Sequence, residues 1–250
     1  MSLDDVPRSP GGSPMLRHAP VDRPFEPGVP GDLAEEVEEK LSAQFGPVGT
    51  VLHEIVSDRI HLDVMLVEPS AERDYWTLFT VGMSARPMSV PPGCEDLRYA
   101  ELVLKLPSDW RLDLLQVTPP TADLERWYWP IRWLKVLARI PHDYDTWLAQ
   151  GHTIPSADPP EPLGPDTRLV GWLTLPPLNP VAAREIALSD GTVLHPLVIH
   201  ALYQDELNLK LKRGTDALLD AFGKAQLSEV LDPTRPSTVA SRKRGLFSWR

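Results

Sequence analysis

The stretch HLDVMLVEPSAERDYWTLFTVGM, residues 61–83, contains two strand-like runs separated by a short polar segment. In residues 60–66 every second side chain is apolar, and His61 and Asp63 fall on the opposite face of the strand. Residues 75–83 are rich in aromatic and β-branched side chains, which favour strands. The segment between the two runs is polar and contains a proline, as turns often do. The sequence therefore predicts two neighbouring strands in this region.

Four strand-like runs follow one another around this stretch. They span residues 48–56, 60–68, 75–83 and 98–106. Ser57, Asp58 and Arg59 are expected to form a short hairpin turn between the first two runs. The fourth run alternates between two sets of positions and is expected to be a half-buried strand. Because no long helix separates the four runs, antiparallel pairing is favoured over a doubly wound sheet.

One helix is predicted before these runs and another after them. The first spans residues 32–45, with Asp32 as the N-cap and Glu35 at the spacing of a capping box. The second lies between Pro130 and Pro141, and Pro141 is expected to stop it near residue 140. Its polar stripe is narrow, so this helix is expected to be the most buried one.

The remainder of the chain is predicted to contain shorter elements. They are a Pro-rich connector at 156–165, a strand at 168–177, a hairpin at 185–194, a strand at 196–203 and helices at 205–214 and 215–225. Asp190 and Gly191 lie between two apolar triplets, which is a strong hairpin signal. Gly214 is expected to close the first helix and Thr215 to cap the second.

Composition divides the 250 residues into a domain and two flanking segments. Residues 1–30 are rich in Pro and Gly and are expected to be a disordered arm, because they cannot bury enough apolar surface. Residues 31–228 are expected to form one domain. Residues 229–250 are expected to be a flexible basic tail that ends in SRKRGLFSWR. This end is either a solvated tail or a contact for an acidic partner or a membrane surface.

Charge and cysteine content exclude several classes of protein. The formal net charge of −10 argues against general nucleic-acid binding, which requires a basic surface. Cys94 is the only cysteine, so an intrachain disulfide and a Cys-rich zinc site are both excluded. No apolar run approaches the ~20 residues that a membrane span needs. The N-terminus lacks the apolar segment of a secretory signal, and a cytoplasmic location is therefore expected.

The stretch PHDYDTWLAQGHTIP, residues 141–155, is the strongest candidate for a chemical site. One hypothesis is a metal-assisted hydrolase that uses His61, Asp63, His142 and His152. Zinc ligands on a helix usually have the HExxH spacing, and this spacing is not present. Motifs of a serine nucleophile and of a phosphate-binding loop are also missing from the sequence. No catalytic residue, metal ligand or cofactor is therefore predicted.

A structural role explains the same stretch without catalysis. Tyr144 and Trp147 are expected to pack on the preceding helix, and Asp145 to cap the following turn. Gly151 is expected to have a positive φ, and His152 to bond to buried backbone groups. These residues would then brace a surface instead of carrying out a reaction.

Three long blocks resemble the suppressor of fused family in its bacterial, single-domain form. They are HLDVMLVEPSAERDYWTLFTVGMSARPMSVPPG (61–93), RYAELVLKLPSDW (98–110) and WPIRWLKVLARIPHDYDTWLAQGHTIPSADPPEP (129–162). The resemblance extends from about residue 33 to 225. It implies an α+β fold with a mixed, largely antiparallel sheet packed by helices, and no enzymatic activity.

The resemblance also implies a binding function. In animals the family retains a transcription factor in the cytoplasm, and the partner peptide adds a strand in a cleft between two domains. Because the present sequence ends shortly after the first domain, that cleft is not expected here. Bacterial relatives look like immunity proteins of polymorphic toxin systems. A regulatory domain of a larger bacterial assembly is a further alternative.

We therefore predict a non-catalytic module that binds a protein. One candidate partner is a basic toxin domain, which the negative net charge of this chain would attract. The contact surface is predicted on the polar strand face and the loops beside it. The residues assigned to it are His61, Asp63, Tyr75, Thr77, Ser84, Arg86, Asp145, Trp147 and His152. Neither nucleic acid nor a cofactor is expected to bind.

Overall fold

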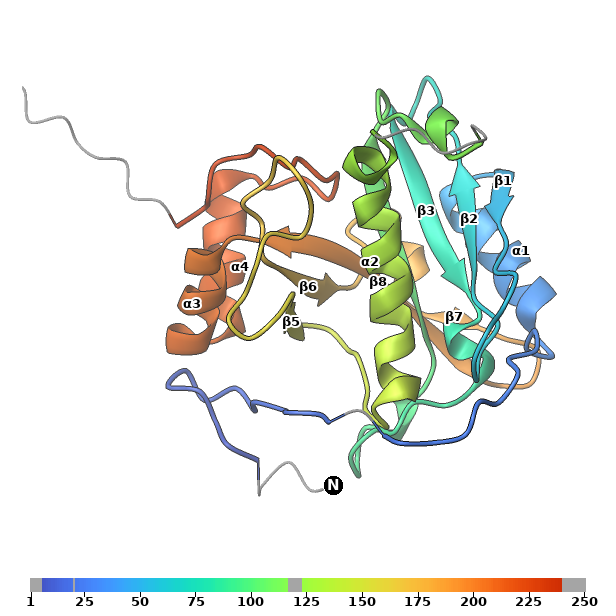
Figure 1. Ribbon diagram of the computed structural model, residues 1–250, viewed down its shortest axis with the longest axis horizontal. Coiled ribbons are helices and arrows are strands. Elements are labelled where there is room, and N and C mark those ends of the chain that lie inside the picture. The colour runs from blue at the N-terminus through green and yellow to red at the C-terminus, as the bar shows by residue number, and fades with distance from the viewer. Residues whose placement is uncertain (1–5, 20, 117–122, 240–250) are drawn as a thin grey trace, which may run out of the picture.

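The computed structural model describes residues 6–19, 21–116 and 123–239, which form one mixed sheet with helices on both of its faces (Figure 1). The strands are β1 (Val48–Leu52), β2 (Asp63–Val67), β3 (Tyr75–Val81), β4 (Ala100–Pro107), β5 (Thr153–Pro155), β6 (Gly171–Leu175), β7 (Ile186–Ala187) and β8 (Val193–Leu202). The α-helices are α1 (Ala34–Phe45), α2 (Leu124–Asp143), α3 (Gln204–Arg213) and α4 (Thr215–Ala225). Short 3-10 turns lie at Met83–Ala85, Glu95–Leu97, Leu112–Gln116 and Val181–Arg184.

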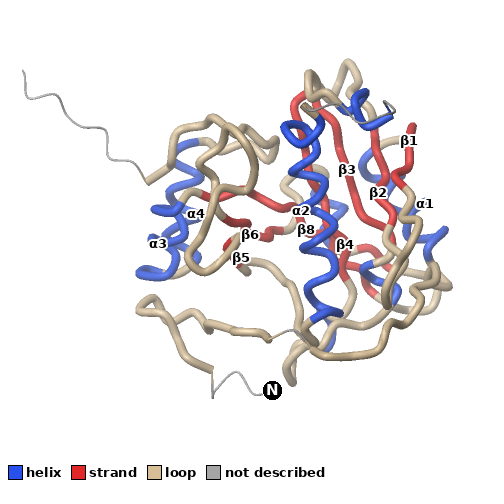
Figure 2. Tube along the Cα trace, in the orientation of Figure 1, coloured by secondary structure: helices blue, strands red, loops and turns tan. Residues whose placement is uncertain are grey.

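The order of strands in the sheet is β1-β2-β3-β4-β8-β6-β5, and β7 pairs with β8 (Figure 2). The first four strands pair antiparallel in sequence order, as their succession predicts. Strand β8 joins β4 in parallel, and the remaining pairs are antiparallel. The hairpin at Asp190 and Gly191 is confirmed, because Ile186 pairs with Leu194 across it. The α+β class with a largely antiparallel sheet is therefore confirmed.

Helix α2 covers one face of the sheet and carries the largest core. Leu134 and Leu137 of this helix are fully buried against alternate residues of the central strands, and Trp129 stacks near Trp172 of β6. The set Ile60, Leu62, Val64 and Leu66 belongs to this core, as the alternation predicts.

The opposite face is covered by the other three helices. Helix α1 packs its apolar stripe, which includes Leu41 and Phe45, on Met65 and Phe79. Helices α3 and α4 pack on the β6 and β8 part of the sheet, where Leu202 is fully buried. Both faces of the central strands are consequently covered, which makes β4 buried along nearly its whole length. The prediction of a half-buried β4 is wrong for this reason, and Glu101 and Lys105 are buried on it.

Several predicted boundaries and caps also differ from the structure. Strands β1 and β2 pair as expected, but the loop that joins them comprises residues 53–62 and is not a tight turn. Helix α2 begins at Leu124 instead of at Pro130. It also continues through Pro141 to Asp143, because a proline so near the end removes only one intrahelical bond. Helix α1 begins after Leu33 without a side-chain cap, so Asp32 does not act as its N-cap. Thr215 likewise starts α4 without a capping bond, and Gly214 holds the cap position.

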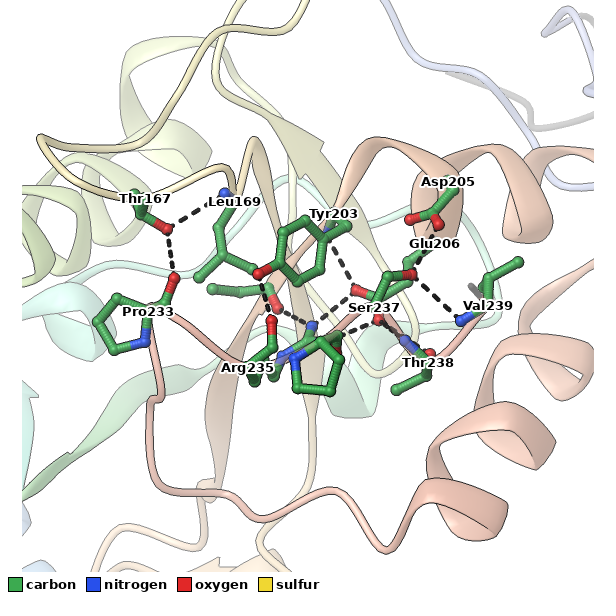
Figure 3. Close-up of polar contacts among 12 residues, drawn as sticks. Thr167, Leu169, Tyr203, Asp205, Glu206, Pro233, Arg235, Ser237, Thr238 and Val239 are labelled. Atoms are coloured by element: carbon green, nitrogen blue, oxygen red, sulfur yellow. Dashed lines mark hydrogen bonds and ion pairs between the residues drawn. The ribbon is translucent and has the colours of Figure 1, made fainter. Parts of the chain in front are cut away.

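Both flanking segments lie on the domain in the described residues. The predicted disorder of residues 1–30 differs from the structure, in which the Gly11 amide donates to the Leu211 carbonyl at 2.7 Å. The predicted start of the tail at residue 229 also differs. Leu231 is buried in the main core, and the Arg235 guanidinium bonds to the fully buried Glu206 (Figure 3). The basic end of the tail, SRKRGLFSWR, lies outside the described residues.

None of the helices in the described ranges combines the length and the apolar composition that a membrane crossing requires.

The histidine buried in β8 makes stability dependent on pH. His200 is 8% exposed beside Phe222, and burial lowers its pKa from 6.5 to about 4. The unfolded chain therefore binds a proton that the folded chain rejects, and this contribution to stability is lost as pH falls from 6.5 towards 4. The loss approaches about 3 kcal/mol at pH 4. Urea unfolding at pH 7, 5 and 4 should show a smaller decline for His200→Leu than for wild type. Parallel declines would contradict this assignment.

Candidate functional site

A pocket of about 380 Å³ opens where the C-terminal end of α2 meets the β1–β2 loop and the loop after β3. Its lining residues are Arg23, Arg59, Arg86, Pro87, Ser89, Pro141, His142 and Asp145. Three arginines thus converge on one pocket of a chain whose net charge is −10. Two of the predicted site residues, Arg86 and Asp145, lie in this lining.

A buried carboxylate fixes the loop after β3 that forms one wall of the pocket. Glu101 of β4 is fully buried and accepts hydrogen bonds from the backbone amides of Gly82 and Ser84, both at 2.9 Å. The hydroxyls of Thr80 and Ser84 donate to the same carboxylate at 2.6 Å. Burial raises the pKa of the Glu101 carboxyl, and these donors oppose that shift because they favour the ionised form. The predicted contact residue Ser84 therefore has a structural bond to Glu101.

Gly82 and His142 complete the support of this loop. Gly82 has a φ of 126°, and a Cβ at this position would lie 1.9 Å from the His61 carbonyl oxygen, so only glycine fits. The His142 Nε2 lies 2.8 Å from the Met83 carbonyl oxygen and holds the loop to α2. Burial lowers the pKa of His142 and keeps the ring neutral, so that Nε2 donates this bond as an N–H. His142, which belongs to the stretch 141–155, therefore has a structural role.

The β1–β2 loop forms the second wall and is organised by Glu54. This carboxylate accepts a hydrogen bond from the Ser57 hydroxyl at 2.8 Å and pairs with Arg139 of α2. Arg139 also donates to the Asp58 carbonyl at 3.0 Å. The loop is therefore attached to α2, and it places Arg59, which has a φ of 65°, at the pocket.

Ser57, His61 and Asp63 are arranged in a chain that has the composition of a catalytic triad. The Ser57 Oγ lies 3.1 Å from His61 Nδ1, and His61 Nε2 lies 3.2 Å from Asp63 Oδ1. The Ser57 proton, however, is donated to Glu54, because a carboxylate can only accept it. Because this proton is committed to Glu54, it is not transferred to His61, and the serine is not activated as a nucleophile. The chain stabilises the loop.

Asp63 is likewise committed to the loop. Its carboxylate accepts from the Glu54 amide at 3.2 Å and lies 3.0 Å from His53 Nδ1. A charge reversal at Asp63 would disrupt these bonds as well as any partner contact. Arg86, whose side chain is 42% exposed, is a better probe of the surface.

Trp147 and His152 lie next to each other, at the approach to β5. Their rings meet edge to face at 4.6 Å, and burial lowers the pKa of His152 to about 4. The Lys210 Nζ donates to Thr153 Oγ1 at 3.0 Å, and burial lowers the pKa of this lysine to about 8. Gly151 has the predicted positive φ of 80°. Asp145 does not act as the predicted cap: its carboxylate pairs with Arg23.

Tyr75 and Thr77 are separated from the other predicted residues. Asp63 pairs with Val81 at one end of the β2–β3 ladder, whereas Thr77 pairs with Val67 at the other end. Thr77 is also fully buried. At about 3.4 Å per residue the two ends are well over 10 Å apart, so these two side chains do not extend the surface around the pocket.

The four residues of the metal hypothesis are not brought together. His61 contacts Asp63, but His142 bonds to the Met83 carbonyl and His152 packs on Trp147. Across the described ranges, no three His, Cys, Asp or Glu side chains are grouped closely enough to bind one metal ion.

Sequence reasoning missed two arginines of the pocket and the buried acid that supports its wall. Arg59 and Arg23 belong to no motif, and Glu101 lies in a run that was expected to be half-buried. A charged residue that alternates with apolar ones in an otherwise apolar strand was the available signal for Glu101.

Comparison with known proteins identifies the fold and the family. A chain of a solved Sufu–Fu complex superimposes with a TM-score of 0.58 and 13% identity, over 84% of this chain and 93% of that one. A suppressor of fused homologue from Neisseria gonorrhoeae gives a TM-score of 0.57 and 16% identity, over 84% and 98% of the two chains. Drosophila Suppressor of Fused gives 0.54 and 13%, and the match covers 87% of this chain but 54% of that protein.

No protein with a curated description matches the chain. The family model of suppressor of fused protein (SUFU), however, matches residues 58–236, which include every lining residue of the pocket except Arg23. The chain therefore belongs to the suppressor of fused family.

Proposed function

We propose that this protein is a non-catalytic binding module that neutralises or sequesters a protein partner by stoichiometric association in the cytoplasm. The proposal rests on how the polar residues around the pocket are hydrogen-bonded. His142, Glu101 and Ser57 are bonded to backbone or to neighbouring side chains, so they hold loops in place. Arg86 and Asp145 pair with Glu26 and Arg23 but stay 42% and 53% exposed on those loops, so a partner can reach them.

The finer proposal is an immunity-type role towards a basic toxin domain. A net charge of −10 attracts a basic partner at long range and disfavours acidic competitors. Association by a preformed rigid surface also suits tight binding, because little ordering entropy is lost. The relative that was solved as a Sufu–Fu complex supports a protein partner in general terms.

A titration of the purified protein with a basic toxin domain tests the proposal. We expect saturation at a fixed stoichiometry. Arg86→Glu and Asp145→Lys should each raise Kd at least about tenfold, which corresponds to ~1.4 kcal/mol. Because both side chains are substantially exposed, the melting temperature of each variant should stay close to that of wild type.

Arg111→Glu is the matched control. Arg111 is 53% exposed and pairs with Asp113, but it lies near the Pro107 end of β4, away from the pocket. It should leave Kd unchanged apart from the small effect of net charge. Equal affinities for wild type, Arg86→Glu and Asp145→Lys would remove the pocket surface from the proposal.

A further inference from the structure

The N-terminal strap, residues 6–19 and 21–30, runs along the pocket end of the molecule (Figure 1, dark blue). At one end Gly11 approaches the α3–α4 turn so closely that a Cβ would lie 2.5 Å from the Gly214 nitrogen. At the other end Arg23 pairs with Asp145, and Glu26 pairs with Arg86. The strap therefore contacts the two exposed charges that form the proposed docking surface.

Residues 26–28 of the strap pair with the β1–β2 loop in the manner of a strand. The Arg59 amide donates to the Glu26 carbonyl at 2.7 Å, and the Gly28 amide donates to the Ser57 carbonyl at 3.0 Å. Pro27 and Asp58 form an antiparallel bridge between them. Backbone pairing of this kind is how proteins bind extended peptides at an exposed edge.

Gly28 adds a steric requirement to this pairing. A Cβ at Gly28 would lie 2.5 Å from the Ile60 carbonyl carbon, which is backbone and cannot move aside easily. The site therefore accepts only glycine at this position, which is two residues after the one that pairs with Arg86.

The strap is held by few apolar contacts near the pocket. Phe25 and Val29 are 61% and 69% exposed. The Glu26–Arg86 pair is also exposed, and such pairs typically contribute only about 0–1 kcal/mol. Segments with little apolar burial open at low free energy, so a competing segment can replace this one.

We infer that the surface formed by Arg59, Arg86 and Asp145 is a binding site for an extended peptide segment, and that residues 23–28 of the chain occupy it as an internal competitor. The external segment has an acidic residue that reaches Arg86 and a glycine two positions later. This inference rests on the proposed function and specifies its site. The net charge acts on the partner as a whole, whereas this local chemistry selects the docking segment.

A labelled peptide of residues 21–30, VDRPFEPGVP, tests the site without any partner. The receptor is the full chain with Glu26→Arg and Gly28→Val, in which the internal segment no longer fits. We expect this receptor to bind the peptide at least about tenfold more tightly than wild type, whose tethered segment competes at an effective concentration in the millimolar range. The peptide with Glu26→Arg should bind the same receptor at least about tenfold more weakly.

The single variant Glu26→Ala, at a position 52% exposed, keeps the test valid if the double variant does not fold. It should show tighter peptide binding than wild type. Equal affinity of wild type and both variants for the peptide, or no binding to either variant, would overturn the inference. Because no partner is used, these outcomes are distinct from failure of the toxin titration.

Discussion

Replacement of Arg235 by alanine is expected to lower the free energy of unfolding by about 3–5 kcal/mol, because it leaves a buried carboxylate without its counter-charge. The Glu206 carboxylate is fully buried, and both of its oxygens accept from Arg235 at 2.7 Å (Figure 3). Arg235 also donates to the Ala201 carbonyl at the end of β8. Urea unfolding followed by circular dichroism measures the loss.

The same change should release the segment after α4. Thr238 donates to Glu206 through its amide and its hydroxyl, and Ser237 donates to Asp205. Arg235 holds this segment beside Glu206, and the bonds of Ser237 and Thr238 form only when the segment lies there. Proteolysis of the segment should therefore become faster in Arg235→Ala.

Arg132→Ala is the matched control, because the Arg132–Glu125 pair is exposed and should contribute less than about 1 kcal/mol. A loss for Arg235→Ala that is as small as the control would contradict the role assigned to the buried pair.

Glu101→Leu is expected to lower the free energy of unfolding by about 3–5 kcal/mol, because it leaves several buried donors without an acceptor. The donors concerned are the amides of Gly82 and Ser84 and the hydroxyl of Thr80. Glu101→Gln should cost less, because the amide oxygen still accepts some of these bonds. Urea unfolding gives the free energies. Hydrogen exchange at Gly82 and Ser84 should become faster in both variants.

Glu95→Leu tests whether removal of any acid from this region has the same effect. Glu95 is exposed and lies in the short turn before β4, so its loss should change stability by less than about 0.5 kcal/mol. If Glu101→Leu resembles this control, the carboxylate does not anchor the loop after β3.

The sheet could be predicted from the sequence where local patterns decide the structure. Alternation in residues 60–66 and the aromatic and β-branched composition of residues 75–83 correctly indicated the β2–β3 pair, and Asp190-Gly191 correctly indicated the hairpin. The burial of both faces of β4 could not be predicted, because the apolar cluster on its second face includes α1, which is distant in sequence. A charged residue such as Glu101 therefore looked solvent-facing although it lies in the core.

The candidate site was predicted only in part, for a different physical reason. Arg86 and Asp145 were assigned to a surface from their loop positions, and both lie at the pocket. The strap contacts them with a segment whose composition indicates disorder. Its pairing with the β1–β2 loop uses backbone amides and carbonyls of Glu26, Gly28 and Arg59, and such bonds have no side-chain signature. Tyr75 and Thr77 lie in the same sheet as Asp63 but at the opposite end of the β2–β3 pair. Only the register of the strands shows this separation.

The most direct measurement for the account is a calorimetric titration of the wild-type chain with its partner, followed by mass spectrometry of the partner recovered from the cell. The account predicts a sharp equivalence point, a weaker complex for Arg86→Glu, and a partner of unchanged mass. A partner that is cleaved or modified by a substoichiometric amount of this chain would contradict it.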